Sequence, residues 1–333
     1  MTLRPLIPLL AAMPLLFADP PTDTDDPLLA GCEAAAAYSR AHGGHAFLVR
    51  RAGEVVFERY FEGWTADRPH FLASGTKSFS GALAAAAVED GLIRWDERLS
   101  DTISEWKDDP RKSRITVRQL LSLTGGLDPG KIARVPTGAE AIGAEALHDP
   151  GTVFAYGPVP FQAFGEFMTR KLLPRKETPL GYLRRRIFHP IGLVTGDWNH
   201  DADGNAQLPS GASVTARDWS RFGELILNRG KSGKRQVVAW DALSECFRPG
   251  QVNPDYGLTF WLGVESKRGG SQTPLPEGFC MAAGAGNQRL YILPSHGLVV
   301  VHFARLSLRF DDRELLRLLL ENLPAPATPR PPR

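Results

Sequence analysis

The sequence predicts an α+β domain: an antiparallel sheet with N- and C-terminal helices packed on it and a large inserted helical region. Strand patterns occur near both ends of the chain, at residues 46–60 and 288–303. Between them, residues from about 74 to 230 carry mostly helical signals. The two halves of the sheet must therefore come together around the insertion, an order that is not a series of βαβ units.

The composition is that of an ordinary globular protein. Hydrophobic residues make up 43% and charged residues 23% of the 333 residues. The 39 basic residues nearly balance the 37 acidic ones, for a net charge of +2. A nucleic-acid-binding domain usually has a marked basic excess, so we expect no nucleic-acid partner.

The N-terminus predicts export. In residues 1–18, Arg4 precedes an apolar run from Leu6 to Ala18, as in a secretory signal peptide. The run is too short to span a bilayer, so we expect a periplasmic or secreted protein with no transmembrane segment after signal removal. An acidic, Pro-rich linker occupies residues 19–27. It separates the run from Leu29-Ala30-Gly31-Cys32, which resembles a lipoprotein cleavage box, so lipidation is less favoured, as is a cytoplasmic location.

The first elements of the domain are a helix and a hairpin. Residues 28–42 are Ala-rich and end at Gly43-Gly44, a normal helix stop. The apolar segments 46–49 and 54–60 flank Ala52-Gly53, which predicts a β-hairpin.

The insertion begins with an Ala-rich stretch over residues 74–90 that closes at Gly91. Thr116-x-x-Gln119 and Thr215-x-x-Asp218 have the spacing of capping boxes and predict two further helix starts. Gly230 is expected to end the second of these helices.

Strand signals return in the last third of the chain. A final helix is expected after them, and the Pro-rich tail cannot continue it. The expected strands are Tyr256–Val264, Gln288–Leu293 and Gly297–Phe303, followed by the helix Asp311–Asn322 and the tail at residues 324–333.

The three cysteines do not form a disulfide scaffold, since Cys32, Cys246 and Cys280 are few and widely spaced. At most one bridge can form, for which Cys246 and Cys280 are the candidates. The alternative is three small buried thiols.

Ser74-Gly75-Thr76-Lys77 is the first motif that carries chemistry. Its spacing puts Lys77 one turn after Ser74 on the same helix face. Serine is a weak nucleophile until a base takes its proton, and lysine can be that base only where burial lowers its pKa. The apolar run that follows predicts such burial. Alternatively, Ser74 is a cap and Lys77 a surface lysine; Ser104-Glu105-Trp106-Lys107 repeats the spacing in a charged stretch.

The surrounding motifs resemble those of the penicillin-recognising serine hydrolases, which include class C β-lactamases, esterases, D-amino-acid peptidases and 6-aminohexanoate-dimer hydrolases. The resemblance runs over about residues 30–320 and implies a β-lactamase/transpeptidase-like domain at 28–323. It also implies that Ser74 is the nucleophile and Lys77 its base. The motifs are Ser74-Gly75-Thr76-Lys77-Ser78-Phe79, Glu89-Asp90-Gly91-Leu92, Trp95-Asp96-Glu97 and Ile115-Thr116-Val117-Arg118-Gln119-Leu120-Leu121-Ser122-Leu123-Thr124-Gly125-Gly126-Leu127.

The family's second motif, Tyr-x-Asn, corresponds to Tyr156-Gly157-Pro158, with a helix expected over 161–171. The resemblance implies that Tyr156 moves the proton between Ser74, Lys77 and the leaving group. Pro158 replaces the asparagine, so one amide contact to lysine and substrate is lost. The alternative for Tyr156 is a packing residue in a turn.

The third motif, Lys-Thr-Gly or His-x-Gly, lies in the family on a strand beside the serine. Lys231-Ser232-Gly233 matches it literally but follows a helix and comes too early in the chain. By position the counterpart is Ala282-Ala283-Gly284, in which Ala282 replaces the basic residue. The backbone N–H groups of Ser74 and Ala285 are expected to form the oxyanion hole, with Gly284 beside them.

No metal or cofactor is expected. The histidines lack His-x-x-x-His spacing, and Asp201-x-Asp203-x-Asn205 fits a polar turn better than a calcium loop. Trp198 and His200 either line the substrate cleft or belong to a plain loop.

These observations predict a serine hydrolase that cleaves an ester or amide bond of a small molecule through an acyl-enzyme. A carboxylesterase or linear-amide hydrolase is favoured over a β-lactamase because Ala282 and Pro158 depart from the family pattern. The alternative is a catalytically idle relative that binds cell-wall peptides or a protein partner. The oligomeric state is not predicted.

Overall fold

The fold is built on a five-stranded antiparallel sheet whose strands come from both ends of the chain. The computed structural model describes residues 26–264 and 270–323. Strand β1 pairs with β10 in the middle of the sheet, which confirms the predicted reassembly around an insertion. In spatial order the strands are β2 (Glu54–Tyr60), β1 (Gly44–Arg51), β10 (Leu298–Ala304), β9 (Gln288–Leu293) and β8 (Cys280–Gly284).

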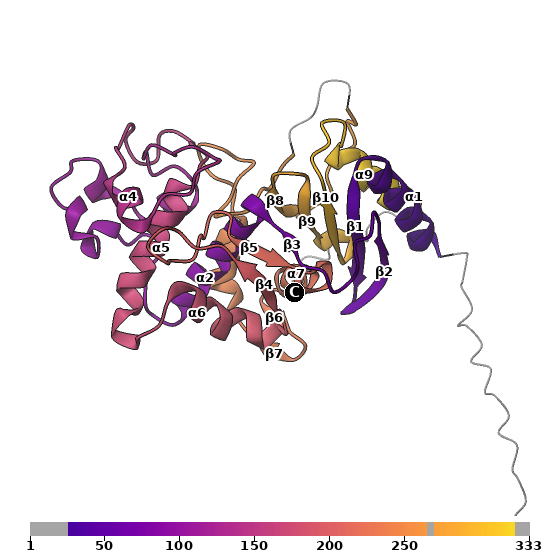
Figure 1. Cartoon of the computed structure of the whole chain (residues 1–333), viewed down its shortest axis with the longest axis horizontal. Coiled ribbons are helices and arrows are strands. Elements are labelled where there is room, and N and C mark those ends of the chain that lie inside the picture. Colours follow the sequence, from indigo (N-terminus) through magenta and orange to yellow (C-terminus); the bar gives the residue numbers. More distant parts are fainter. Residues whose placement is uncertain (1–25, 265–269, 324–333) are drawn as a thin grey trace, which may run out of the picture.

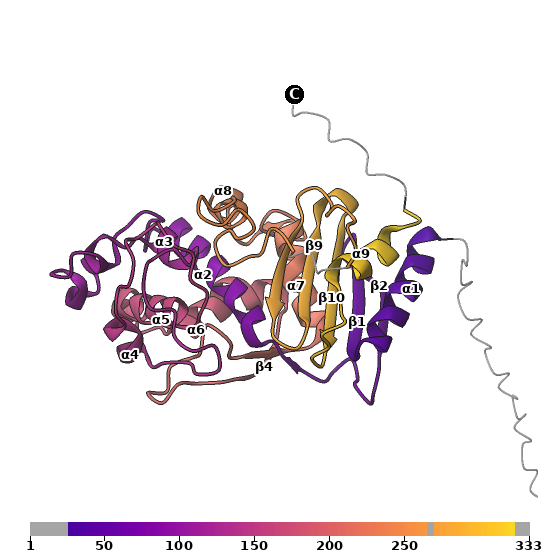
Figure 2. The same ribbon diagram turned by 90° about the horizontal axis from the view of Figure 1, so that it is seen from above.

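Helices cover both faces of this sheet. Helix α1 (Pro27–Ala41) and helix α9 (Asp312–Leu320) lie together on one face, around a core that includes Phe47 and Tyr291 (Figures 1 and 2). Helix α7 (Ala216–Leu227) packs on the other face and belongs to the larger core. Both terminal helices were predicted within two residues.

The insertion forms a helical region beyond the β8 edge of the sheet (Figure 1). Its first helix, α2, is buried along most of its length, because small alanines let neighbouring elements approach closely. Its helices are α2 (Lys77–Glu89), α3 (Val117–Leu121), α4 (Gly138–Gly143), α5 (Val159–Leu172) and α6 (Pro179–Leu183); the hairpin β6 (Lys231–Ser232) and β7 (Arg235–Gln236) and the short helix α8 (Trp240–Leu243) follow α7.

A small antiparallel sheet that the sequence did not predict joins the insertion to the segment just before it. Strands β3 (His70–Phe71), β5 (Ala212–Val214) and β4 (Thr195–Trp198) lie side by side in that order. Strands of two to four residues are too short to show a two-residue period.

The predicted helix starts are largely correct. Thr116 and Gln119 form a reciprocal capping box at α3. Thr215 caps α7 by accepting from the backbone N–H of Asp218. The Asp218 carboxylate accepts from the Thr215 hydroxyl and from the N–H of Val194.

The strand predicted at Tyr256–Val264 is wrong. This segment makes only isolated bridges, from Tyr256 to Trp261 and from Trp261 to Met281 of β8. Thr259 has a left-handed φ of 74°, which breaks an extended conformation. Tyr256, Leu258 and Phe260 are nevertheless buried. The segment contacts α2 through the Thr259 hydroxyl, which donates to the Ser78 carbonyl, and contacts β8 through Trp261.

The predicted signal peptide (1–18) and tail (324–333) lie outside the described residues, as does most of the linker. Helix α1 begins at Pro27, one residue before the predicted domain start, with Asp26 as its cap. Within residues 26–264 and 270–323, no helix is long and apolar enough to cross a bilayer. All three cysteines are buried free thiols, with no bridge between Cys246 and Cys280.

Candidate active site

Ser74 and Lys77 lie at the junction of a short 3₁₀ helix (Ala73–Thr76) and α2. The Lys77 Nζ atom is 3.0 Å from Ser74 Oγ, because residues three apart share a helix face. Ala73 has a left-handed φ of 47°, a strained conformation for a residue with a Cβ. The Thr76 hydroxyl donates to the Ala73 carbonyl at 2.8 Å and helps hold this turn.

Lys77 is buried with only 4% of its surface exposed. Burial lowers the pKa of its amine from 10.5 to about 7, so the neutral form is accessible near neutral pH. Its Nζ lies 4.9 Å from the ring centroid of Tyr156 and 5.4 Å from that of Phe161. A neutral amine can accept the Ser74 proton, and these surroundings therefore suit a general base.

The carbonyl oxygen of Pro209 provides the remaining polar contact of Lys77. Nζ donates to it at 3.0 Å, and this contact orients the lone pair of a neutral amine. The turn around Pro209 is tied to the serine segment, since the N–H of Ala212 donates to Thr76 Oγ1 at 3.2 Å. Sequence reasoning missed Pro209, because a backbone carbonyl 132 residues away leaves no side-chain signal.

Tyr156 lies beside both residues. Burial raises the pKa of its phenol, and a side-chain hydrogen bond with Ser74 acts in the opposite direction. Pro158 occupies the N-cap position of α5 without a side-chain capping bond, where the family motif would place an asparagine side chain. The acceptor for Lys77 comes from Pro209 instead.

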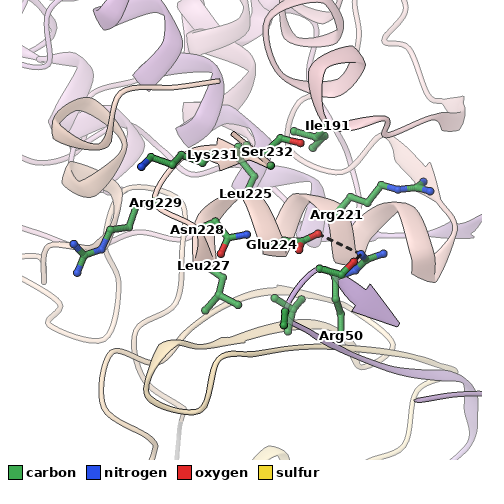
Figure 3. A pocket seen from close by; sticks show the side chains of 14 residues that line it. Arg50, Ile191, Arg221, Glu224, Leu225, Leu227, Asn228, Arg229, Lys231 and Ser232 are labelled. Carbon is green, nitrogen blue, oxygen red and sulfur yellow. Dashed lines mark hydrogen bonds and ion pairs between the residues drawn. The ribbon is translucent and has the colours of Figure 1, made fainter. Parts of the chain in front are cut away.

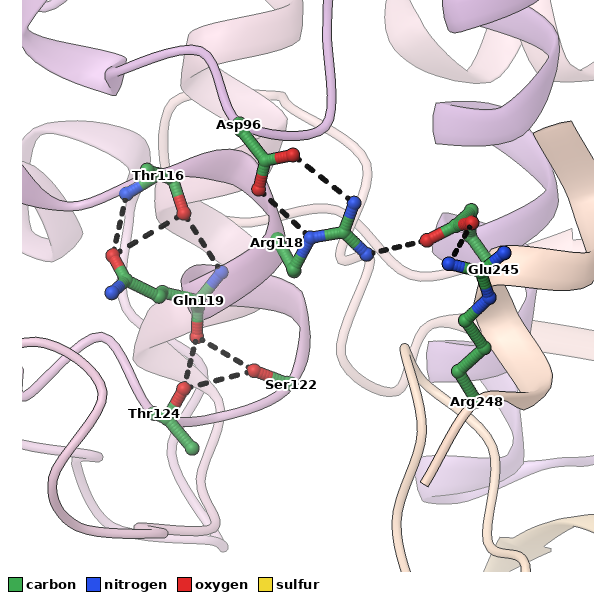
Figure 4. Close-up of polar contacts among 8 residues, drawn as sticks. All are labelled: Asp96, Thr116, Arg118, Gln119, Ser122, Thr124, Glu245 and Arg248. Carbon is green, nitrogen blue, oxygen red and sulfur yellow. Dashed lines mark hydrogen bonds and ion pairs between the residues drawn. The ribbon is translucent and has the colours of Figure 1, made fainter. Parts of the chain in front are cut away.

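The segment 116–124 anchors the loop that carries Tyr156. The N–H groups of Ala155 and Gly151 donate to the carbonyls of Leu123 and Thr124 at 2.9 and 2.7 Å. The segment is itself held by the capping box and by Arg118, which bridges Asp96 and Glu245 (Figure 4).

Strand β8 places its backbone against the serine turn. A Cβ added to Gly284 would come within 1.9 Å of the Leu72 carbonyl oxygen, so only glycine allows this approach. Ala285 follows in the exposed turn between β8 and β9, and Ala282 is buried at 2% exposure. Position 282 therefore offers no cation to a substrate.

The other sequence candidates lie apart from this cluster. Lys231 and Ser232 line a separate cavity of about 730 Å³, in which Glu224 turns towards Arg50 while Lys231 points away (Figure 3). His200 lines another pocket, of about 240 Å³, between α5 and α6.

Two further candidates have structural roles. Trp198 is buried against Phe79 and Phe188 and is part of the core. Asp201 closes a polar turn by accepting from the N–H groups of Asp203 and Asn205. In the part of the chain that the structure describes, no three His, Cys, Asp or Glu side chains are grouped to hold a metal.

The sequence matches the Beta-lactamase family over residues 29–322. The chain therefore belongs to this family of β-lactamase-fold serine hydrolases. It is 27% identical over 260 residues to an uncharacterised protein of Alkalihalophilus pseudofirmus. The aligned region covers 71% of this chain and 73% of that protein.

Solved structures show the same fold at low sequence identity. A Bacillus anthracis protein classed as a 6-aminohexanoate-dimer hydrolase superposes with a TM-score of 0.70 at 22% identity, over 86% of this chain and 79% of that one. A family VIII carboxylesterase superposes with a TM-score of 0.69 at 17% identity, over 89% of this chain and 98% of the esterase chain.

Proposed function

We propose that the protein hydrolyses an ester or amide bond through an acyl-enzyme on Ser74. The observation that carries this proposal is the 3.0 Å contact between Ser74 Oγ and a buried lysine whose pKa is lowered to about 7. A surface lysine would be protonated at neutral pH and unable to accept a proton.

The reaction begins when Ser74 loses its proton to Lys77 and Oγ attacks the carbonyl carbon. The resulting oxyanion accepts hydrogen bonds from the N–H groups of Ser74 and Ala285, next to Gly284. Tyr156 passes the proton to the leaving oxygen or nitrogen, and the bond to the leaving group breaks. Water then attacks the acyl-enzyme, gives up its proton to the same groups, and releases the acid and free Ser74.

The substrate is a carboxylic ester or linear amide in preference to a β-lactam. The strand beside the serine carries Ala282 where a β-lactamase has a cation for the substrate carboxylate. Position 158 is a proline and cannot hold a substrate amide. The carboxylesterase and the 6-aminohexanoate-dimer hydrolase class among the structural neighbours support this choice.

The test is intact-mass labelling with a fluorophosphonate together with turnover of p-nitrophenyl acetate. We expect the wild type to gain one adduct and to hydrolyse the ester, and Ser74→Ala to do neither. Ser104→Ala is the matched control and should behave like the wild type. A folded wild type that neither labels nor turns over would indicate instead a binding protein without catalysis.

A further inference from the structure

Four aromatic rings form a cluster beside the proposed catalytic tyrosine. The Trp261 ring lies 5.7 Å from the Tyr156 ring at an interplanar angle of 32°, and 6.3 Å from Phe154. Tyr256 lies beneath all three, with centroid distances of 4.9 to 6.4 Å. Most of the ring pairs in the cluster meet edge to face, and Tyr156 and Trp261 lie more nearly parallel.

The backbone fixes Trp261 on the same strand edge as the serine turn. Its N–H donates to the Met281 carbonyl at 3.0 Å, and the Met281 N–H donates back at 2.8 Å. Met281 precedes Gly284 by three residues on β8, which corresponds to about 10 Å along a strand. Tyr156 is a neighbour of both Trp261 and Ser74: its ring lies beside that of Trp261, and its side chain hydrogen-bonds with Ser74.

The four rings of the cluster differ in burial. Tyr256 is 1% exposed and forms its floor, while Phe154, Tyr156 and Trp261 are half-buried. Half-buried rings whose positions are set by backbone pairing and mutual edge contacts form a rigid apolar surface. Among these four residues there is no charged side chain.

We propose that Trp261 and Phe154 form a subsite for an aromatic leaving group. The proposal rests on the function proposed above, in which Tyr156 protonates the leaving atom and so fixes that atom at the phenol hydroxyl. In this proposal, an aromatic ring one or two bonds beyond the leaving atom contacts Trp261, whose ring centroid is 5.7 Å from that of Tyr156. Planar rings gain from such contacts beyond the area they bury.

Benzyl acetate and ethyl acetate test the subsite, because both release a primary alcohol and share the acetyl group. We expect the wild type to prefer benzyl acetate in kcat/KM by about tenfold or more. Trp261→Leu should lower kcat/KM for benzyl acetate, through KM, by a larger factor than for ethyl acetate and so remove most of this preference, while Ser74 still labels with the fluorophosphonate. Cyclohexylmethyl acetate should fall between the two esters, which separates ring stacking from simple apolar burial.

Trp240→Leu is the matched control, since Trp240 is also half-buried and stacks on Phe247 with centroids 5.9 Å apart. It should keep the wild-type preference. Equal wild-type turnover of the two esters, or an equal loss for both in Trp261→Leu, would overturn the subsite. A protein whose Ser74 does not label would instead overturn the proposed function on which the subsite rests.

Discussion

The chain contains the Ser-x-x-Lys spacing twice, and the two copies lie in opposite environments. Lys77 is buried against aromatic rings, and its Nζ contacts Ser74 at 3.0 Å. Lys107 is exposed, and the Ser104 hydroxyl donates to Glu105 at 3.3 Å. Both copies begin in 3₁₀ turns, so the spacing alone does not distinguish them. The two copies differ in the desolvation of the lysine, which is buried in the first copy and exposed in the second.

Removing the base should produce the largest difference between the two copies. We expect Lys77→Gln to lower kcat/KM for p-nitrophenyl acetate by about 10²- to 10⁴-fold, the usual contribution of a positioned general base. Lys107→Gln should leave it unchanged. Steady-state kinetics on both variants, with circular dichroism to show that each is folded, gives the comparison. Equal activity of the two variants would contradict a role for burial.

Tyr156 lies beside the Ser74–Lys77 copy of the motif. The loss of activity in Tyr156→Phe should therefore depend on whether the leaving group needs a proton. We expect a loss of about 10²-fold for an anilide, whose nitrogen must be protonated. The loss should be smaller for p-nitrophenyl acetate, because nitrophenolate leaves without a proton. Parallel kinetics with acetanilide-type and nitrophenyl substrates measure this ratio. A uniform loss would make Tyr156 a packing residue.

Burial of Lys77 should also lower the stability of the fold at neutral pH. The difference between 10.5 and about 7 is equivalent to about 5 kcal/mol, offset by two hydrogen bonds of about 1 kcal/mol each. Lys77→Met should therefore raise the free energy of unfolding by roughly 3 kcal/mol at pH 7. Lys107→Met should not change it.

The contribution of Lys77 to the free energy of unfolding depends on pH with a definite sign. Between about pH 7 and 10.5 the unfolded chain binds a proton at Lys77 that the folded protein does not, so wild-type stability rises with pH through this window. Lys77→Met should lack that rise. Urea denaturation at pH 7 and pH 9.5 measures both effects, and a wild-type slope that persists in the variant would contradict them.

Local periodicity and capping signals predicted the longer helices and most strands of the reassembled sheet, but not the short helices α4, α6 and α8. Spacing offered Ser74 and Lys77 as one of two candidate pairs, and the resemblance to the serine hydrolases favoured this pair, whose side chains lie in contact. Sequence reasoning missed β3 to β5, whose strands are too short to show a pattern. It also missed Pro209, which acts through a carbonyl, and it assigned a strand where Thr259 turns the chain. These features depend on contacts between distant segments, which a linear pattern does not record.

Site-resolved labelling tests most directly whether burial of Lys77 activates Ser74. The protein is labelled with a fluorophosphonate between pH 5 and 9, digested, and the adduct rate is measured on the peptides containing Ser74 and Ser104. We expect adduct on Ser74 alone, with a rate that rises about tenfold per pH unit and levels off above about pH 7. Adduct on Ser104, or a Ser74 rate independent of pH, would contradict activation by a buried neutral lysine.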